Sequence, residues 1–279
     1  MKVRIIVDST ADLIPEVKEK IIVVPMTVRF GDEEFIDGVT INHKEFYEKL
    51  VETDIMPTTS QATPAMFDEH FKRIAEAGES AVVLTLASKL SGTYQSAMLA
   101  ASQYENIYVV DSGSVAIGSG ILAELALQLA DSGMNAKEIA EKLEQEKKKV
   151  LIVAMVDTLE YLKRGGRVSK TVAFAGGLLN IKPVLSVSDG EILMLGKARG
   201  SKQGNNLLVT EIEKAGGVDF TKPLLLGYTG LSDVLLQKYI EDSKALWEQS
   251  KTELNTTVVG SVIGTHAGPG AVAVAFFKK

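Results

Sequence analysis

The stretch that decides the fold is residues 81–99, AVVLTLASKLSGTYQSAML. Its first part, 81–87, is an almost continuous apolar run, which predicts a strand whose two faces are both covered. Residues 94–104 predict the helix that follows. Small or hydroxyl-bearing residues occupy the junction between them: Ser88, Ser91, Gly92 and Thr93. This pattern is typical of an open α/β sheet, which holds ligands at the carboxyl ends of its strands.

The rest of the first half repeats this alternation of strand and helix. Short β-branched runs at 3–8 and 107–112 predict further strands, and Pro64 predicts the first residue of a helix. A highly charged helix is expected over 135–149. Repeated β-α units imply a parallel sheet with right-handed crossovers. We therefore expect residues 1–149 to form an α/β domain with a mostly parallel sheet and flanking helices.

The pattern changes after about residue 149. Residues 150–157 and 223–230 predict strands, and Asp189-Gly190 between two apolar runs is a strong signal for a two-residue β-hairpin. Hairpins mixed with helices indicate antiparallel pairing. We therefore expect residues 150–279 to form a second, α+β domain with a mainly antiparallel sheet.

The composition argues against several classes of function. The chain has 279 residues, no cysteine, three histidines far apart in the sequence and a formal net charge of −6. Without cysteine there are no disulfides, no thiol chemistry and no cysteine-based zinc site, and we expect neither a metal nor another cofactor. The negative net charge argues against nucleic acid as a partner, because a phosphate backbone calls for a basic face.

No segment has the pattern of a membrane span. The most apolar window, 113–130, is interrupted by Glu124 and Gln128 and therefore predicts a buried helix. Near the N-terminus, Asp8 follows the first apolar run too early for the core of a signal peptide. We expect a cytoplasmic protein with no stable insertion into a membrane.

Hydroxyl-bearing loops adjoin several of the predicted strands. In a parallel sheet such loops share one edge, so we expect Thr59, Ser91 and Gly92 to come together there. Hydroxyls and free amides at a helix start can bind a small anion, and Gly92 would allow close approach to the backbone. The phosphate-binding motif GxxxxGK[ST] does not occur, so these mainly neutral donors suit a carboxylate better than a nucleotide. The alternative that each hydroxyl only caps a helix stays open.

The three histidines differ in their surroundings. His266 lies in GTHAGPGA between two apolar runs, where it could donate to a carboxylate directly or through a neighbouring hydroxyl. The alternative is a turn histidine without a ligand. His43 and His70 lie in charged helical stretches and are expected at the surface. Asp8 and Asp111 are expected to accept hydrogen bonds from local backbone amides.

Two further stretches allow a functional interpretation. In LKRGGRVSK, a glycine pair precedes Arg167 and predicts an exposed turn, where the guanidinium could bind phosphate or carboxylate or could simply be solvated. The next stretch mixes small residues with large apolar ones, which could leave a narrow apolar channel or pack a tight core. Its large residues are Phe174, Leu178, Leu179 and Ile181.

Taken together, these motifs resemble the DegV family. The resemblance runs from end to end and keeps the family's order of motifs. The matching stretches are DSTADL (8–13), TSQ (59–61), LSGTYQSA (90–97), VDS (110–112), TLEYLKRGGRVSK (158–170), GGLLNIKPVL (176–185) and GTHAGPGAV (264–272).

The resemblance implies a two-domain protein that binds a long-chain fatty acid, such as palmitate, between its domains. It implies that Thr59 and Ser91 hold the carboxylate, with Gly92 and His266 in the same region. Some members present the fatty acid to a separate fatty acid kinase, and there the residue matching Arg167 serves the contact with the partner. The chain itself would then have no catalytic residue, and the acyl chain would be its only ligand.

Two other functions are weighed against this one. Ser91 could be the nucleophile and His266 the base of an acyl hydrolase or acyl transferase, although the G-x-S-x-G motif of α/β-hydrolases is missing. Alternatively, the glycine-rich turns could belong to a nucleotide-binding enzyme.

Overall fold

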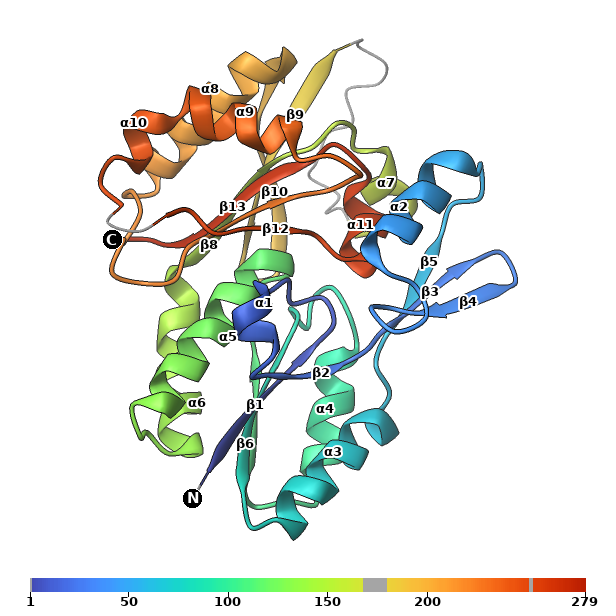
Figure 1. Cartoon of the computed structure of the whole chain (residues 1–279), viewed down its shortest axis with the longest axis vertical. Helices are drawn as coiled ribbons and strands as arrows, with labels where there is room; N and C mark the ends of the chain where they lie inside the picture. The colour runs from blue at the N-terminus through green and yellow to red at the C-terminus, as the bar shows by residue number, and fades with distance from the viewer. Residues whose placement is uncertain (1, 168–179, 251–252) are drawn as a thin grey trace.

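The computed structural model describes residues 2–167, 180–250 and 253–279, and its strands form three sheets (Figure 1). The first sheet is four-stranded, in the order β2-β1-β6-β7. All its pairings are parallel, which confirms the prediction from the alternating strands and helices. Its strands are β1 (Val3–Asp8), β2 (Ile22–Val24), β6 (Ser80–Thr85) and β7 (Ile107–Asp111).

Helices cover both faces of the parallel sheet. In Figure 1, α3 (Pro64–Glu76) and α4 (Thr93–Ala101) lie on one side, and α5 (Ala116–Asp131) and α6 (Ala136–Glu146) lie on the other. Every residue of β6 is buried, as its apolar run predicted. The apolar window at 113–130 contains most of α5, whose first turns are fully buried, so the predicted buried helix is confirmed.

The second sheet is six-stranded, in the order β10-β9-β8-β13-β11-β12. Only its β11–β12 pairing is parallel, so the expected mainly antiparallel sheet is confirmed. Its strands are β8 (Val150–Met155), β9 (Ile181–Ser188), β10 (Glu191–Arg199), β11 (Leu225–Tyr228), β12 (Thr256–Val258) and β13 (Val272–Phe277). All of them follow residue 149, although the division of the chain into two domains at this point stays a prediction.

The hairpin that joins β9 and β10 turns at Asp189-Gly190, as predicted. Both residues have positive φ, +50° and +69°. A two-residue turn of this kind requires a left-handed backbone at both positions, which aspartate tolerates and glycine favours.

The six-stranded sheet has two differently covered faces (Figure 1). Val153 and Met155 of β8 share a core with Leu208 and Ile212 of α8. The alternate residues of β8 face the N-terminal half of the chain. The helices on the outer side are α8 (Gly200–Lys214), α9 (Val234–Asp242) and α10 (Lys244–Trp247).

A third sheet was not predicted. It is three-stranded, in the order β4-β3-β5, with strands β3 (Thr27–Phe30), β4 (Glu33–Ile36) and β5 (Thr58–Ser60). Its pairings are antiparallel, with Thr59 opposite Val28. Thr59 therefore reaches the site from this small sheet and not from a loop of the parallel sheet.

The sequence GTHAGPGA also differs from its expected form. His266 lies in the last turn of α11 (Ser261–Ala267), and the chain turns only at Gly268 and Gly270, whose φ angles are +71° and +82°. The remaining elements are α1 (Pro15–Lys18), α2 (His43–Glu52), the 3-10 helix η1 (Lys147–Lys149) and α7 (Glu160–Arg164). In the described ranges, no helix combines the length and the apolar character that crossing a bilayer requires.

Candidate functional site

A cavity of about 440 Å³ lies between the inner face of the six-stranded sheet and the carboxyl end of the parallel sheet. This volume is within the usual range for small-molecule sites. Alternate residues of β8 point into it, namely Ile152, Ala154 and the following Val156, together with Leu185 and Val187 of β9. The period of two arises because successive side chains of a strand point to opposite faces.

Two alanines are the smallest side chains that this face of the sheet contributes to the cavity. Ala154 of β8 is paired with Ala273 of β13, which is paired in turn with Gly227 of β11. Both alanines line the cavity and are only half-buried, whereas their strand neighbours Val153 and Val274 are completely buried. Because the side chains of Ala154 and Ala273 are short, the sheet has a shallow trough at this pair, which ends at Gly227, where Ile117 and Val259 lie close to the backbone.

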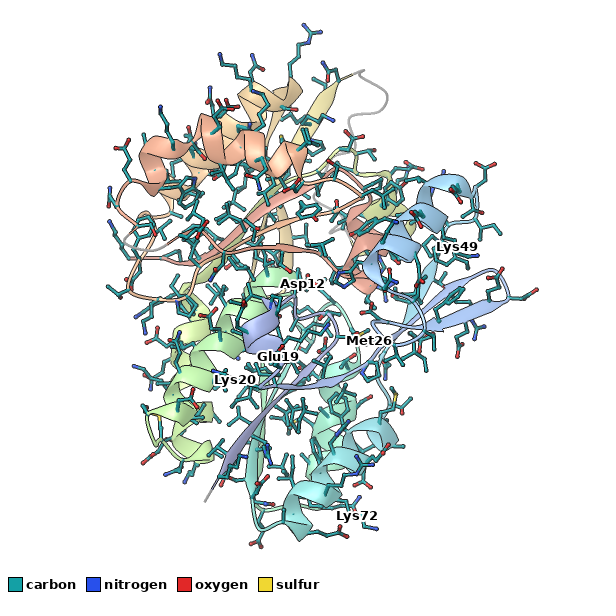
Figure 2. The ribbon with its side chains drawn as sticks, in the orientation of Figure 1. Asp12, Glu19, Lys20, Met26, Lys49 and Lys72 are labelled. Atoms are coloured by element: carbon teal, nitrogen blue, oxygen red, sulfur yellow. The ribbon has the colours of Figure 1, made fainter. Side chains whose placement is uncertain are left out.

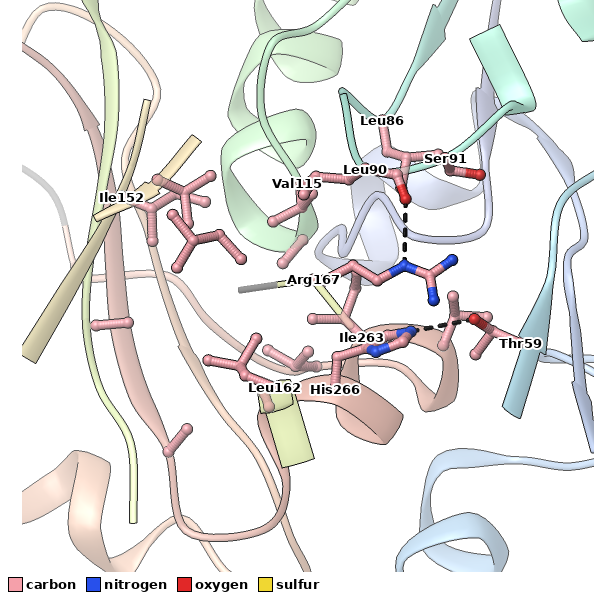
Figure 3. Close-up of a pocket in the computed structure, with 18 of the residues that line it drawn as sticks. Thr59, Leu86, Leu90, Ser91, Val115, Ile152, Leu162, Arg167, Ile263 and His266 are labelled. Atoms are coloured by element: carbon pink, nitrogen blue, oxygen red, sulfur yellow. Dashed lines mark hydrogen bonds between the residues drawn. The ribbon is translucent and has the colours of Figure 1, made fainter. Parts of the chain in front are cut away.

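The opposite wall of the cavity comes from the N-terminal half. Leu86 and Leu90 follow β6, and Val115 and Ile117 lie at the start of α5. Figure 3 shows Val115 between the polar end of the cavity and Ile152 at the far end. The cavity is therefore apolar along its length, with walls from both halves.

At one end, Thr59 and His266 form a hydrogen bond. Thr59 Oγ1 and His266 Nε2 are 3.1 Å apart, although 207 residues separate them in the sequence. Burial, with a smaller effect of Arg167, lowers the pKa of His266 to about 4, so the ring is neutral at pH 7. Nδ1 is buried without a partner in the described part of the chain and lies against Gly165, where a Cβ would come within 2.1 Å of it. The hydroxyl is therefore the ring's hydrogen-bonding neighbour.

Ser91 and Gly92 lie at the same end of the cavity (Figure 3). Ser91 Oγ is 3.0 Å from Thr93 Oγ1 and accepts a hydrogen bond from the Thr93 amide at 3.3 Å, whereas the N-cap position of α4 is Gly92. A Cβ at Gly92 would lie 2.1 Å from Gln61 Oε1, so this position requires glycine unless Gln61 moves. Gln61 itself lines the cavity and donates to Ser96 Oγ at 3.0 Å. Sequence reasoning did not single out Gln61, because a lone glutamine carries no signal of its role.

Arg167 lines the cavity next to these groups. Its Nη1 donates to the Gly165 carbonyl at 2.7 Å, and its Nε donates to the Leu90 carbonyl at 3.4 Å (Figure 3). The residue is exposed, as predicted. Because His266 is neutral, Arg167 supplies the one full charge among the described lining residues. The polar end of the cavity therefore combines neutral donors with one exposed cation.

Some predicted residues are not part of this arrangement. Ile181 is paired with Arg199 at the start of β9 and is absent from the cavity lining. The other predicted tail-pocket residues, Phe174, Leu178 and Leu179, lie outside the described residues.

The predicted role of the strand-end aspartates is confirmed. Asp8 accepts hydrogen bonds from the Thr10 and Leu86 amides at 3.0 and 2.7 Å. Asp111 accepts from the Ser88 and Gly113 amides. These carboxylates fix the loops at the edge of the sheet. His43 and His70 are half-buried and not fully at the surface, and burial lowers the pKa of each.

The geometry does not favour a hydrolase. A serine nucleophile needs its base within hydrogen-bonding reach. Here Ser91 Oγ is bonded to Thr93, and His266 Nε2 is bonded to Thr59. In the ranges that the structure describes, no group of three or more histidine, aspartate or glutamate residues could hold a metal ion.

The fold and site define a class of α/β protein in which two sheets enclose a mostly apolar cavity with one polar end. The chain belongs to the DegV family, since the family's sequence model, described as "Uncharacterised protein, DegV family", matches residues 2–279. The DegV domain-containing protein TTE1491 of Caldanaerobacter subterraneus subsp. tengcongensis is 35% identical over 285 residues, which cover 100% of this chain and 99% of that relative.

Two solved structures are similar over the whole chain. The DegV family protein from Thermus thermophilus, described as binding fatty acid, has a TM-score of 0.90 and 29% identity, with 100% of both chains covered. The stearic acid-binding protein from Eubacterium ventriosum has a TM-score of 0.86 and 27% identity, with 100% of this chain and 99% of that chain covered. These similarities confirm the predicted family and fold class.

Proposed function

We propose that this protein binds a long-chain fatty acid, with the alkyl tail in the cavity and the carboxylate at its polar end. The observation that carries the proposal is the shape and chemistry of the cavity, which is mostly apolar and has the Thr59 and Ser91 hydroxyls, an imidazole and a guanidinium at one end. The similar proteins from Thermus thermophilus and Eubacterium ventriosum, described as binding fatty acid and stearic acid, support it.

The tail supplies most of the binding free energy. A palmitate tail has about fourteen methylenes, and burial contributes about 0.8 kcal/mol for each, or roughly 11 kcal/mol before the costs of association. The carboxylate adds little net affinity, because the loss of its hydration offsets its new hydrogen bonds. The polar end therefore serves mainly to orient the ligand.

The hydroxyls are the groups that would contact the carboxylate. If His266 Nε2 donates its proton to Thr59 Oγ1, the Thr59 hydroxyl proton is free to point into the cavity. Ser91 supplies a second hydroxyl, and Gly92 at the same end makes room for Gln61, which also lines the cavity. Arg167 adds a positive charge near the opening, where a carboxylate would be attracted to it.

We also propose a length and a use for the bound fatty acid. The proposed acyl chain is about as long as that of palmitate. The head group would be presented to a separate fatty acid kinase in the cytoplasm, with Arg167 also serving the contact with that partner. On this account the chain binds and orients the acyl group, and the partner carries out the phosphoryl transfer.

Calorimetric titration of delipidated protein tests the proposal. We expect palmitate to bind at one site, and the double variant Thr59→Val with Ser91→Ala to bind palmitate more weakly while binding methyl palmitate almost as well as wild type. The matched control is Ser132→Ala with Thr210→Val, which removes two exposed hydroxyls that bond only to helix carbonyls. Absence of palmitate binding by the wild type would overturn the proposal. Unchanged palmitate affinity in the double variant would reject the head-group assignment.

A further inference from the structure

The first turn of α11 is attached to the N-terminal half by two buried carboxyl groups. Asp12 Oδ1 accepts a hydrogen bond from the Gly260 amide at 2.8 Å, and Asp37 accepts one from the Ser261 hydroxyl. Gly260 is the residue before α11 and Ser261 is its first. Figure 2 shows Asp12 at the boundary between the N-terminal and C-terminal halves. Both carboxyls therefore link the halves at the start of this helix.

The same helix forms part of the cavity. Val262, Ile263 and Ala267 line it, and His266 in the last turn bonds to Thr59. Because α11 has only seven residues, the position of its first turn fixes the position of its last. The carboxyls at its start consequently help to set where His266 and the apolar lining residues lie.

The two carboxyls are crowded around one point. A Cβ added at Gly260 would lie 3.3 Å from Asp12 Oδ1 and 3.7 Å from Asp37 Oδ2. The exposed fractions of the two residues are only 5% and 4%. Asp12 Oδ2 is also buried, and it has no hydrogen-bond partner among the described residues. Two negative charges so placed would repel each other and would both lack hydration.

The surrounding titratable groups do not balance two charges. Burial lowers the pKa of His43 in α2, so its ring is neutral at pH 7. Burial raises the pKa of Tyr47 in the same helix well above its usual value, and Asp8 of β1 adds a further acidic group nearby. Burial and the nearby Asp37 raise the pKa of Asp12 well above its usual range. Lys18 in α1 is a cation that lowers this pKa, but its effect is weaker than either of those two.

We propose that Asp12 keeps its proton in the folded protein and acts together with Asp37 as a positioning residue, holding α11 and with it His266 and one wall of the cavity. The role in ligand binding rests on the proposed function, whereas the retained proton and the attachment of α11 do not. The protonated Asp12 keeps Oδ1 as an acceptor for the Gly260 amide and places no charge of its own beside Asp37.

The retained proton is tested by the pH dependence of stability. The folded wild type holds a proton that the unfolded chain releases above about pH 4, so its stability falls as pH rises. Asp12→Asn imitates the protonated carboxyl and has no proton to lose. Above about pH 5, we expect the folding equilibrium constant of the wild type to fall relative to Asp12→Asn, by up to about tenfold per pH unit for as long as the folded protein keeps the proton. Parallel curves for the two proteins would show that Asp12 holds no extra proton in the folded protein and would overturn the proposal.

The positioning role is tested by hydrogen exchange and by palmitate release at pH 7. We expect Asp12→Ala to exchange the amides of 261–267 about tenfold faster than wild type and to release palmitate faster, whereas Asp12→Asn matches wild type in both. Asp131→Asn, which changes an exposed acid at the end of α5, is the control. If the amides of 261–267 exchange in Asp12→Ala at the wild-type rate, Asp12 does not hold α11 in place and the positioning role is overturned.

A second variant and the ligand-free measurements cover two cases, a variant that does not fold and a wild type that does not bind palmitate. If Asp12→Ala does not fold, Ser261→Ala removes the donor to Asp37 and should give the same faster exchange at the start of α11. Unchanged exchange in that variant also counts against the proposal. If the wild type fails to bind palmitate, the proposed function fails, but the exchange and stability measurements still decide the attachment and the proton because neither needs a ligand.

Discussion

Filling the trough in the six-stranded sheet should shorten the fatty acid that the protein accepts. Ala154 and Ala273 face each other across β8 and β13, and both are half-buried because they border the cavity. Ala154→Leu adds three carbon atoms at this position. If the tail passes over the trough, the new side chain displaces about three methylenes, which corresponds to about 2.4 kcal/mol. Palmitate should then bind about 60-fold more weakly.

The assay compares two chain lengths on delipidated protein. Calorimetric titration with palmitate and with laurate separates loss of room for the tail from general damage, because a twelve-carbon tail does not need the far part of the cavity. We expect laurate to lose less than about threefold in affinity. Ala77→Leu at the exposed C-cap of α3 is the matched control and should change neither affinity.

Two results would refute this reasoning. Equal losses for palmitate and laurate would show that the new side chain disturbs the head-group end or the fold. Full palmitate affinity in Ala154→Leu would show that the tail does not run over the trough.

Two further predictions concern the polar end of the cavity, and a third concerns exposed ion pairs. His266 should contribute a loss of about 2.5 kcal/mol of stability when pH is lowered from 7.5 to 4.5, because the unfolded chain protonates it near 6.5 and the folded chain only near 4. Because the proton on Asp12 acts in the opposite sense, this contribution is measured as the difference between urea unfolding of the wild type and of His266→Gln, and an equal pH dependence of the two proteins would contradict it. In Gly165→Ala the new Cβ would meet His266 Nδ1 and should push the ring away from Thr59. We expect this variant to fold like the wild type but to release palmitate faster, and an unchanged release rate would contradict this. Lys89→Met breaks exposed ion pairs to the β9–β10 hairpin and should leave the thermal unfolding midpoint almost unchanged, because water and salt screen such pairs; a clear drop in the midpoint contradicts the exposed-pair interpretation.

Much of the architecture could be predicted because it depends on local patterns. The apolar run of β6 and the alternation around it indicated a parallel sheet, and Asp189-Gly190 indicated a hairpin. These signals follow from backbone sterics and from burial on one or both faces of a strand. The helix predicted after Ser91-Gly92 is also present, and it starts at Thr93.

The pairing inside the site could not be predicted from the residues alone. Thr59 meets His266 only because β5 pairs with β3 in a small sheet and because a glycine-rich stretch forms α11, and neither feature has a strong sequence pattern. The trough was also hidden, since Ala154 and Ala273 look like ordinary core residues until the register of β8 against β13 is known. Long-range register of this kind depends on the whole fold.

The most direct measurement of the central claim is mass spectrometry of an organic extract of natively purified protein, with a denatured and washed sample of the same protein as the blank. A fatty acid held in the cavity should survive purification, so the account predicts acyl chains of about palmitate length at close to one per protein molecule. An extract without acyl species, from protein that also takes up no added palmitate, would contradict it.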